Sequence, residues 1–544
     1  MCCLRIVHLA DVHLGIKTKA LGEVGEAVNI ATRNAFKRVI DKIIGLKPDV
    51  VVIAGDLFEK DFGGVSAADI YTAMEALSKL WERGITVIGI EGNHDKPKYL
   101  DLPDIKDIES PLRLLERSHI ILRTEYIVAD RISPSMVKQE IEDLQKKIRN
   151  SYGDVNFDIV IKEIPGATGV YEKYVVVDDT AFVGIQYTPV NKFISMSQKF
   201  FEFIRLFSRV NYETPKKVFI AHQTVEGIVS SDFIKYLNEQ AIELRYLPKG
   251  FDYYALGHIH QYNVGSYDNA YIVYPGSITL RDAGEFDYTF YEGQNSLKKN
   301  KCWDKGLVAY DLENKDLKRI RVKSVSSLTI KVVQKDQGDF YSSLRNIVRQ
   351  ALMMLKKADS EFLESEGDIV DDNPAILVEV KAGGERPLDD VLLKNIVSQT
   401  GAYSTVRVEY DMKKSVYEAN IEEGDSTDME EILRKVFGEK YTYYLDVVES
   451  IGKKDGMSVD NDADAFIKAL RASLEILLDD PKEIEETFGT LVKYVFKHVP
   501  ITLSARSPEK EQSEKPREKN NVEKKTETQK KPLTTKKRSL FDYL

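Results

Sequence analysis

Cysteine is scarce in this chain, and its scarcity excludes two kinds of site. The 544 residues include only three cysteines, Cys2, Cys3 and Cys302. Two of them are adjacent, so they provide neither a disulfide framework nor the ligand spacing of a structural zinc site. Such sparse use of cysteine suits a reducing compartment.

Long apolar runs are also missing from the sequence. The stretch MCCLRIVHLADVHLG has no basic leader followed by an uninterrupted apolar segment, and no later run approaches the roughly 20 apolar residues that cross a bilayer. We therefore expect an intracellular, cytoplasmic protein with no membrane partner. The net charge of −10 argues against a uniformly basic coat for nucleic acid, although it permits a local basic strip.

Short apolar runs alternate with amphipathic helices over the first 310 residues or so. The helix expected at 29–45 repeats its apolar positions at helical spacing. The apolar runs are rich in β-branched and aromatic residues, which favours buried strands. They lie at 4–10, 49–56, 85–92, 217–223 and 252–258. We predict an α/β fold, a β-sandwich flanked by helices, as a first domain over residues 1–315.

The pattern restarts after residue 320. Strands expected at 328–333, 376–381 and 405–410 alternate with helices at 341–357 and 388–398, which is enough for a small α/β domain over 320–412. An acidic, glycine-containing linker at 418–428 leads to a helical region over 428–500. Residues 506–544 hold 12 Lys and Arg against 7 Asp and Glu, and their main part is nearly free of apolar residues. We expect a disordered basic tail there.

Polar side chains gather where the predicted strands end. In an open α/β sheet these ends border one crevice, so residues far apart in the sequence can converge there. Mixed imidazole, carboxylate and amide ligands without thiolate suit Mn²⁺, Fe²⁺ or Zn²⁺. The candidates are more numerous than one coordination sphere requires, which predicts two ions that hold a phosphate and activate water. The residues are Asp11, His13, Asp56, Asn93, His94, Asp95, His222, His258 and His260.

These motifs, in this order, resemble the calcineurin-like metallophosphoesterase superfamily: D-x-H, GD, GNHD, a later H, then GHxH. Within it, LADVHLG, AGDLFEKD, GNHDKP, AHQTVEG, LGHIH and YPGSI are similar to the Mre11 or SbcD double-strand-break repair nucleases, across residues 4–310. In one departure from the family, Glu59 stands where a second catalytic histidine is frequent.

The resemblance implies a role for each residue. One metal would be held by Asp11, His13, Asp56 and His260, and the second by Asp56, Asn93, His222 and His258. Asp56 is the candidate bridge between the two ions. His94 would stabilise the phosphate or protonate the leaving oxygen, and Asp95 is expected to orient the His94 ring.

The resemblance also implies the cofactors, the partners and the activity. We expect two Mn²⁺, or other divalent ions, per subunit of a homodimer that cuts double- and single-stranded DNA. The domain at 320–412 would cap the DNA, and the helices at 428–500 would bind a Rad50-type SMC-like ATPase. The alternatives are a phosphodiesterase or phosphatase for small substrates, and a DNA-repair scaffold with weak nuclease activity.

The carboxyl terminus carries a short apolar motif after the basic tail. Leu540, Tyr543 and Leu544 are spaced like the motif that docks on DNA sliding clamps, as in archaeal replication and repair proteins, although Lys537 stands where that motif usually has Gln. We therefore expect the tail to be a tether to a sliding clamp.

Overall fold

The computed structural model describes most of residues 4–410. The gaps within this range are 17–21, 23–24, 60–64, 96–109, 129–133, 154, 189–193, 231–233, 235–240, 282, 301–304, 335–339, 366 and 384–387. The predictions for the linker, the helical region at 428–500, the tail and its terminal motif lie outside the described residues.

A first sheet is built around four short parallel strands. These are β1 (Arg5–Leu9), β2 (Val50–Ile53), β3 (Thr86–Gly89) and β4 (Leu122–Arg123), and Val7, Val51 and Val87 lie side by side in them. On the other side of β1 the sheet continues with antiparallel β17 (Gly306–Asp311) and β18 (Asp316–Gln334). The second half of β18 pairs in parallel with β15 (Tyr288–Tyr291) and β19 (Asp368–Ala382). The edges are β16 (Lys298–Lys299) and β20 (Tyr403–Tyr410).

A second sheet faces the first. Its parallel centre consists of β8 (Thr180–Ile185), β9 (Lys216–His222), β12 (Tyr253–Gly257) and β14 (Ala270–Tyr274). Antiparallel strands flank this centre: β5 (Glu125–Val128), β6 (Phe157–Glu163), β7 (Val170–Val177) and β13 (Asn263–Tyr267). A separate pair is formed by β10 (Val225–Glu226) and β11 (Ile242–Glu243).

The strand β12 shows how one apolar run serves two cores. Tyr253 and Ala255 point into the core shared with the first sheet, whereas Tyr254 and Leu256 point into the core on the other face. This alternation is the period of two that strand geometry imposes. Because both faces are buried, the run is continuously apolar, as expected for a parallel strand covered on both sides.

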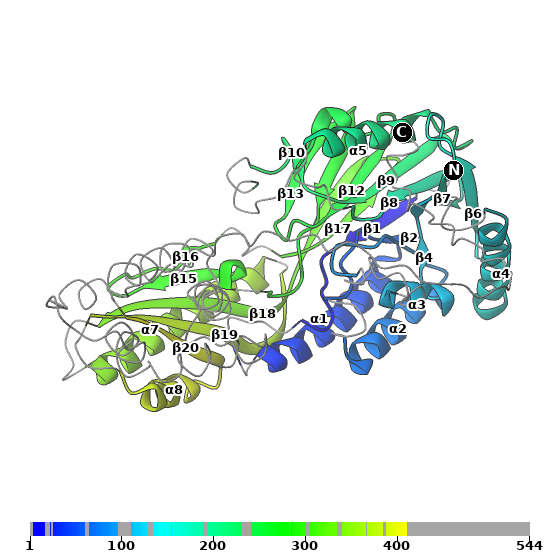
Figure 1. Cartoon of the computed structure of the whole chain (residues 1–544). Coiled ribbons are helices and arrows are strands. Elements are labelled where there is room, and N and C mark those ends of the chain that lie inside the picture. The colour runs from blue at the N-terminus through cyan, green and yellow to red at the C-terminus, as the bar shows by residue number, and fades with distance from the viewer. Residues whose placement is uncertain are drawn as a thin grey trace, which may run out of the picture. The chain divides into compact units, whose positions relative to one another are not determined.

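Helices cover the outer faces of the sheets (Figure 1). They are α1 (Gly25–Leu46), α2 (Ala67–Trp81), α3 (Pro111–Arg117), α4 (Pro134–Tyr152), α5 (Ile194–Leu206), α7 (Phe340–Glu364) and α8 (Asp390–Ser398). Three short 3-10 turns accompany them: η2 (Phe207–Arg209), η3 (Leu244–Tyr246) and η4 (Ala283–Glu285). The helix α2 begins with a capping box, in which Ser66 and Asp69 each accept the main-chain N–H of the other.

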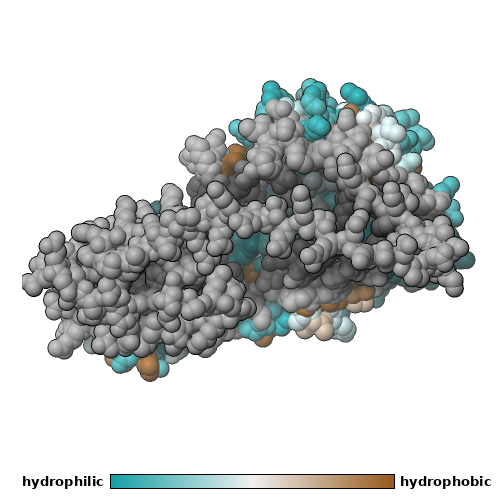
Figure 2. Space-filling view, viewed as in Figure 1, coloured by the Kyte–Doolittle hydropathy of each residue, from teal (hydrophilic) through white to brown (hydrophobic). Residues whose placement is uncertain are grey.

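The helices α7 and α8 pack on the same face of the sheet formed by β18, β19 and β20 (Figure 1). The predicted mixed α/β architecture, with sheets flanked by helices, is confirmed. In the coloured part of Figure 2, the face shown is largely hydrophilic with a few hydrophobic spots. Among the described helices, the search for an apolar segment long enough to span a membrane found none.

Candidate metal centre

Five parallel strands end at one place, and a predicted ligand or ligand pair follows each of them. The strands come from both sheets, so residues about 250 positions apart in the sequence meet there. The groups are Asp11 and His13 after β1, Asp56 after β2, Asn93 and His94 after β3, His222 at the end of β9, and His258 and His260 after β12.

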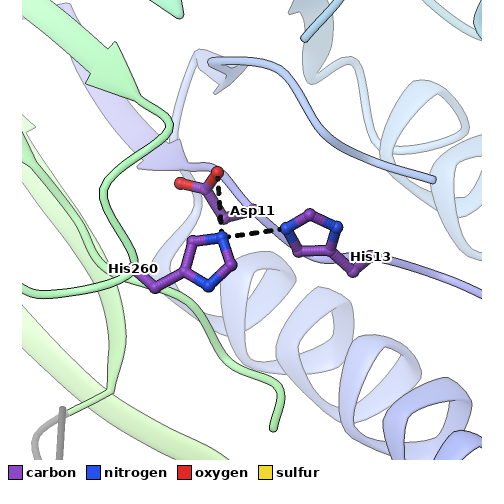
Figure 3. A group of neighbouring side chains, drawn as sticks. All are labelled: Asp11, His13 and His260. Atoms are coloured by element: carbon purple, nitrogen blue, oxygen red, sulfur yellow. Dashed lines mark hydrogen bonds and ion pairs between the residues drawn. The ribbon is translucent and has the colours of Figure 1, made fainter. Parts of the chain in front are cut away.

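One group of side chains that could hold a metal ion consists of Asp11, His13 and His260 (Figure 3). The Nε2 atoms of the two histidines are 3.0 Å apart, and Nε2 of His260 is 3.7 Å from Oδ1 of Asp11. Both Asp11 and His13 are fully buried. These three residues belong to the first of the two predicted ligand sets.

A second group consists of Asp11, Asp56 and His222. The Nε2 atom of His222 lies 3.2 Å from Oδ2 of Asp56 and 3.0 Å from Oδ1 of Asn93. His258 joins this group through Asn93, since its Nδ1 is 3.2 Å from the same amide oxygen. The structure therefore brings the members of the second predicted set together as well.

Asp56 lies between the two groups. Its Oδ2 is 3.2 Å from Nε2 of His222 and 3.8 Å from Nε2 of His13, and its Oδ1 accepts the main-chain N–H of His94 at 2.8 Å. Burial opposes ionisation of this carboxyl, but the nearby His222 and His13 rings hold its pKa well below the usual value. Asp56 is thus an anion between two sets of ligand atoms, the position that a bridging ligand would require.

The backbone of the centre is strained at four non-glycine residues. Asp11, His13 and Asp56 have φ angles of 54°, 52° and 50°, and His258 has a φ of 91°. Left-handed backbone is unfavourable for residues with a Cβ, and such strain is concentrated at functional sites. Packing around these turns therefore holds the ligands in place at a local energetic cost.

Two glycines make room for the ligands. A Cβ on Gly257 would collide with the carbonyl oxygen of Ala54, and one on Gly92 would collide with the Asp56 carboxylate. The sequence predicted tight turns at these glycines, but close approach of the backbone is what excludes a side chain here.

Carboxylates contact the outer nitrogens of both histidines in the first group. Glu59 Oε2 is 2.9 Å from Nδ1 of His13, and Glu285 Oε1 is 2.5 Å from Nδ1 of His260. Carboxylate partners of this kind fix the tautomer of a metal-binding histidine. The sequence analysis missed Glu285, because it lies in η4 beyond the strand-end motifs. Its burial among charges was the only signal, and that signal is spatial.

The arrangement of proton acceptors fits a bound cation. If His13 and His260 each donate Nδ1–H to a carboxylate, both Nε2 atoms present lone pairs to each other at 3.0 Å. Likewise, Nδ1 of His222 donates to the carbonyl of Ala54 at 2.8 Å, which leaves its Nε2 facing oxygen atoms. Converging acceptors repel one another unless a proton or a metal ion lies among them.

The charge state of His222 supports the same conclusion. Burial lowers its pKa, but the carboxylates of Asp56 and Asp11 outweigh burial and raise the pKa to about 9. The protein alone therefore keeps a proton where the oxygen atoms converge. A divalent ion supplies more positive charge at that position than a proton does, so the donor set suits one.

His94 is beside these groups, and its ring has two partners. Nδ1 donates to the carbonyl of Glu59 at 2.8 Å, and Nη2 of Arg281 donates to Nε2 at 2.9 Å. Burial lowers the pKa of His94 to about 4. His94 also belongs, with His13 and Asp56, to a third group of potential ligands. The ring is therefore neutral in the protein alone.

The contacts of Asp95 differ from the predicted orientation of the His94 ring. Its two oxygens accept main-chain N–H groups, from Phe58 at 2.9 Å and from Gly92 at 3.0 Å. Burial and the nearby Asp56 raise the pKa of Asp95 to about 7. Asp95 thus ties the turn after β2 to the turn after β3.

Comparisons with known proteins place this centre in a family. Residues 4–262 match the family model described as calcineurin-like phosphoesterase. The chain is 29% identical over 257 residues to the DNA double-strand break repair protein Mre11 of Methanopyrus kandleri, which is 47% of this chain and 44% of that protein. It is 26% identical over 349 residues to the protein of the same name from Methanocaldococcus jannaschii, covering 64% and 74%.

A bacterial relative is similar at the same level. The chain is 25% identical over 281 residues to the SbcD component of the nuclease SbcCD from Staphylococcus saprophyticus, which is 51% of this chain and 61% of that protein. The aligned region thus spans less than half of the M. kandleri protein and less than two thirds of this one. Residues 4–262 form a calcineurin-like phosphoesterase domain, and its homologues include Mre11 and SbcD nucleases of archaea and bacteria.

Proposed function

We propose that this chain is a manganese-dependent DNA nuclease that acts in double-strand-break repair, with 3′ to 5′ exonuclease and single-strand endonuclease activity. The observation that carries the proposal is the position of Asp56 between two sets of ligand atoms, with His94 beside them. Two ions in such a site hold a phosphate and lower the pKa of the attacking water.

The side chains of this chain would do the remaining work. Asp11, His13, Asp56 and His260 would bind one ion, and Asp56, Asn93, His222 and His258 the other. His94 would contact the phosphate or give a proton to the leaving oxygen. Because its pKa is about 4 in the protein alone, the negative charge of an incoming phosphate is needed to favour the protonated, donating form.

The printed names of the relatives support DNA as the substrate. Two of them are called DNA double-strand break repair proteins, and the third is named as part of a nuclease. Cleavage of linear duplex DNA by the purified full chain, with and without Mn²⁺, tests the proposal. Cleavage that requires Mn²⁺ and is abolished by a chelator is expected, whereas hydrolysis of small phosphoesters alone would overturn it.

A variant separates the proposed centre from a contaminating nuclease. Asp56→Ala should lose both ions, because one carboxylate serves both sets of ligands, and should therefore lose DNA cleavage. Retention of one ion at full occupancy, measured by elemental analysis, would contradict the bridge.

We also propose partners for the regions outside the described residues. The name of the bacterial relative marks it as one component of a larger complex, which supports a Rad50-type ATPase bound by residues 428–500 of a homodimer. Stimulation of cleavage by the ATPase tests this. The terminal motif Leu540, Tyr543 and Leu544 is proposed to bind a DNA sliding clamp. A peptide of residues 530–544 should bind it with a micromolar Kd, about −8 kcal/mol, and calorimetry without binding would end that idea.

A further inference from the structure

Arg281 is a charged side chain at the metal centre that none of the strand-end motifs contains. Its Nη2 donates to Nε2 of His94 at 2.9 Å, and its Nε is 3.8 Å from Oε2 of Glu59. Its main-chain N–H donates to Oε2 of Glu285 at 3.1 Å. The backbone of Arg281 is therefore tied to the carboxylate that holds His260, while its guanidinium reaches the proposed proton donor.

The surroundings of Arg281 differ from those of a structural arginine in the same chain. Arg123 is 4% exposed and forms ion pairs with Glu91, Glu116 and Glu125 at 2.8–3.1 Å. Arg281 is 37% exposed, and its shortest side-chain contact is with a neutral imidazole. An arginine that only stabilised the fold would be expected to have the first kind of environment.

The contact with His94 is also a poor use of a guanidinium. Charge-assisted pairs with phosphate or carboxylate are roughly twice as strong as hydrogen bonds between neutral groups, and the planar fork of arginine matches two phosphate oxygens. The Nε2 atom of His94 is the atom that the proposed function assigns to the phosphate. A substrate phosphate that reached this atom would meet the guanidinium at the same point.

We propose that Arg281 is a phosphate-binding residue, which leaves His94 Nε2 when a phosphate enters and then holds that phosphate beside His94. Glu59 would keep the guanidinium near the centre in both states, since it lies 3.8 Å from Nε. The proposal rests on the proposed function and deepens it. Arg281 would then contact the scissile phosphate in a chain where Glu59 has replaced a second histidine.

Two substitutions at this position test the proposal. In Arg281→Gln the charge and the fork are lost, and in Arg281→Lys the charge remains without the fork. Calorimetry of inorganic phosphate with the Mn²⁺-loaded full chain should show binding at least about ten-fold weaker in Arg281→Gln, with partial recovery in Arg281→Lys. The KM for linear duplex DNA should rise in the same order, while the Mn²⁺ content stays unchanged.

Arg149 provides a matched control. It is 46% exposed and forms an ion pair with Asp158 in the region of α4 and β6. Arg149→Gln should leave phosphate binding unchanged. Equal phosphate affinity in the wild type, Arg281→Gln and Arg149→Gln would overturn the proposal.

The two measurements separate this inference from the proposed function. Phosphate calorimetry does not depend on DNA cleavage, so it tests Arg281 even if DNA is not the substrate. A wild type that binds phosphate through Arg281 but does not cut DNA would overturn the proposed function and support the phosphate site. A wild type that cuts DNA as well as Arg281→Gln does, with equal KM, would overturn the inference alone.

Discussion

Each neutral imidazole at the centre has one N–H proton, and its neighbours decide which nitrogen carries it. Ala54 offers a carbonyl to His222, and Glu59 and Glu285 offer carboxylates to His13 and His260. These acceptors all contact Nδ1, so Nε2 is left to face the ligand atoms of the centre. The orientation of the rings is thus fixed by the protein and does not depend on a bound ion.

His94 differs from the candidate ligands because its Nε2 faces Arg281. We expect His94→Gln to keep the Mn²⁺ content of the wild type but to lower DNA cleavage by about 10²- to 10⁴-fold, the usual contribution of a general acid or base. Elemental analysis and single-turnover cleavage measure the two quantities. Loss of metal from this variant would instead assign His94 to the third group of ligands.

Glu285 permits a test of the carboxylate partners. Glu285→Gln keeps the shape of the side chain but removes the negative charge 2.5 Å from His260. Loss of such a partner weakens metal binding by about 10- to 100-fold, and titration of the metal-free chain with Mn²⁺ should show this for one of two ions. Glu75→Gln, in a surface ion pair with Lys37, is the control that should leave both affinities unchanged.

The sequence was sufficient for the strand-end ligands but not for their partners. Asp11 and His13, or His258 and His260, are recognisable because each pair follows a buried strand at a spacing of two. Glu285 and Arg281 follow no such strand, and their contacts with His260 and His94 exist only in three dimensions. The ligand roles themselves stay predictions that the metal measurements test.

At the scale of whole elements, buried parallel strands and amphipathic helices were the predictable part. The helices expected at 29–45 and 341–357 correspond to α1 and α7, and the apolar run at 252–258 corresponds to β12. Antiparallel strands with charged residues were missed, such as β6 (FDIVIKE) and the first half of β18. One face of these strands is polar, so they lack the continuous apolar run that marks a buried strand.

The strand β7 carries a buried carboxyl whose proton links it to the segment after α5. Tyr212 Oη is 2.9 Å from Oε2 of Glu172 and donates to the carbonyl of Phe207 at 2.9 Å. A hydroxyl has one proton, so both contacts are satisfied fully when Glu172 is protonated and donates to Tyr212. Burial raises the pKa of Glu172 well above its usual value, which agrees with this arrangement.

This carboxyl should make stability depend on pH. Above about pH 4.5 the unfolded chain releases the Glu172 proton while the folded chain keeps it, so the free energy of unfolding falls as pH rises toward the folded pKa. Glu172→Gln imitates the protonated form, and we expect it to flatten this decline in urea unfolding between about pH 5 and 8. Glu163→Gln, at an exposed position near the end of β6, should keep the slope of the wild type. Equal slopes in all three proteins would contradict the assignment.

At the scale of the described molecule, one apolar cluster joins elements from distant parts of the chain. Val28 and Ala31 of α1 pack with Val325 of β18 and Leu377 of β19. Leu280 and Phe286, which flank the segment that carries Arg281 and Glu285, lie in the same cluster and are buried. The sheet that contains β19 therefore supports the segment that contacts His94 and His260. Apolar periodicity alone does not indicate which elements share a core, so this connection was not predictable from the sequence.

Leu377→Ala tests that connection. Removing a fully buried leucine side chain should lower the free energy of unfolding by about 2–5 kcal/mol, because the cluster loses apolar contacts and retains part of the cavity. Since Leu280 and Phe286 would lose packing, we also expect weaker Mn²⁺ binding at temperatures where the variant is still folded. Leu363→Ala, at a position 49% exposed on α7, should change the unfolding free energy by less than about 0.5 kcal/mol and leave Mn²⁺ affinity unchanged. If Leu377→Ala is destabilised but binds Mn²⁺ as the wild type does, the cluster stabilises the fold without supporting the metal centre.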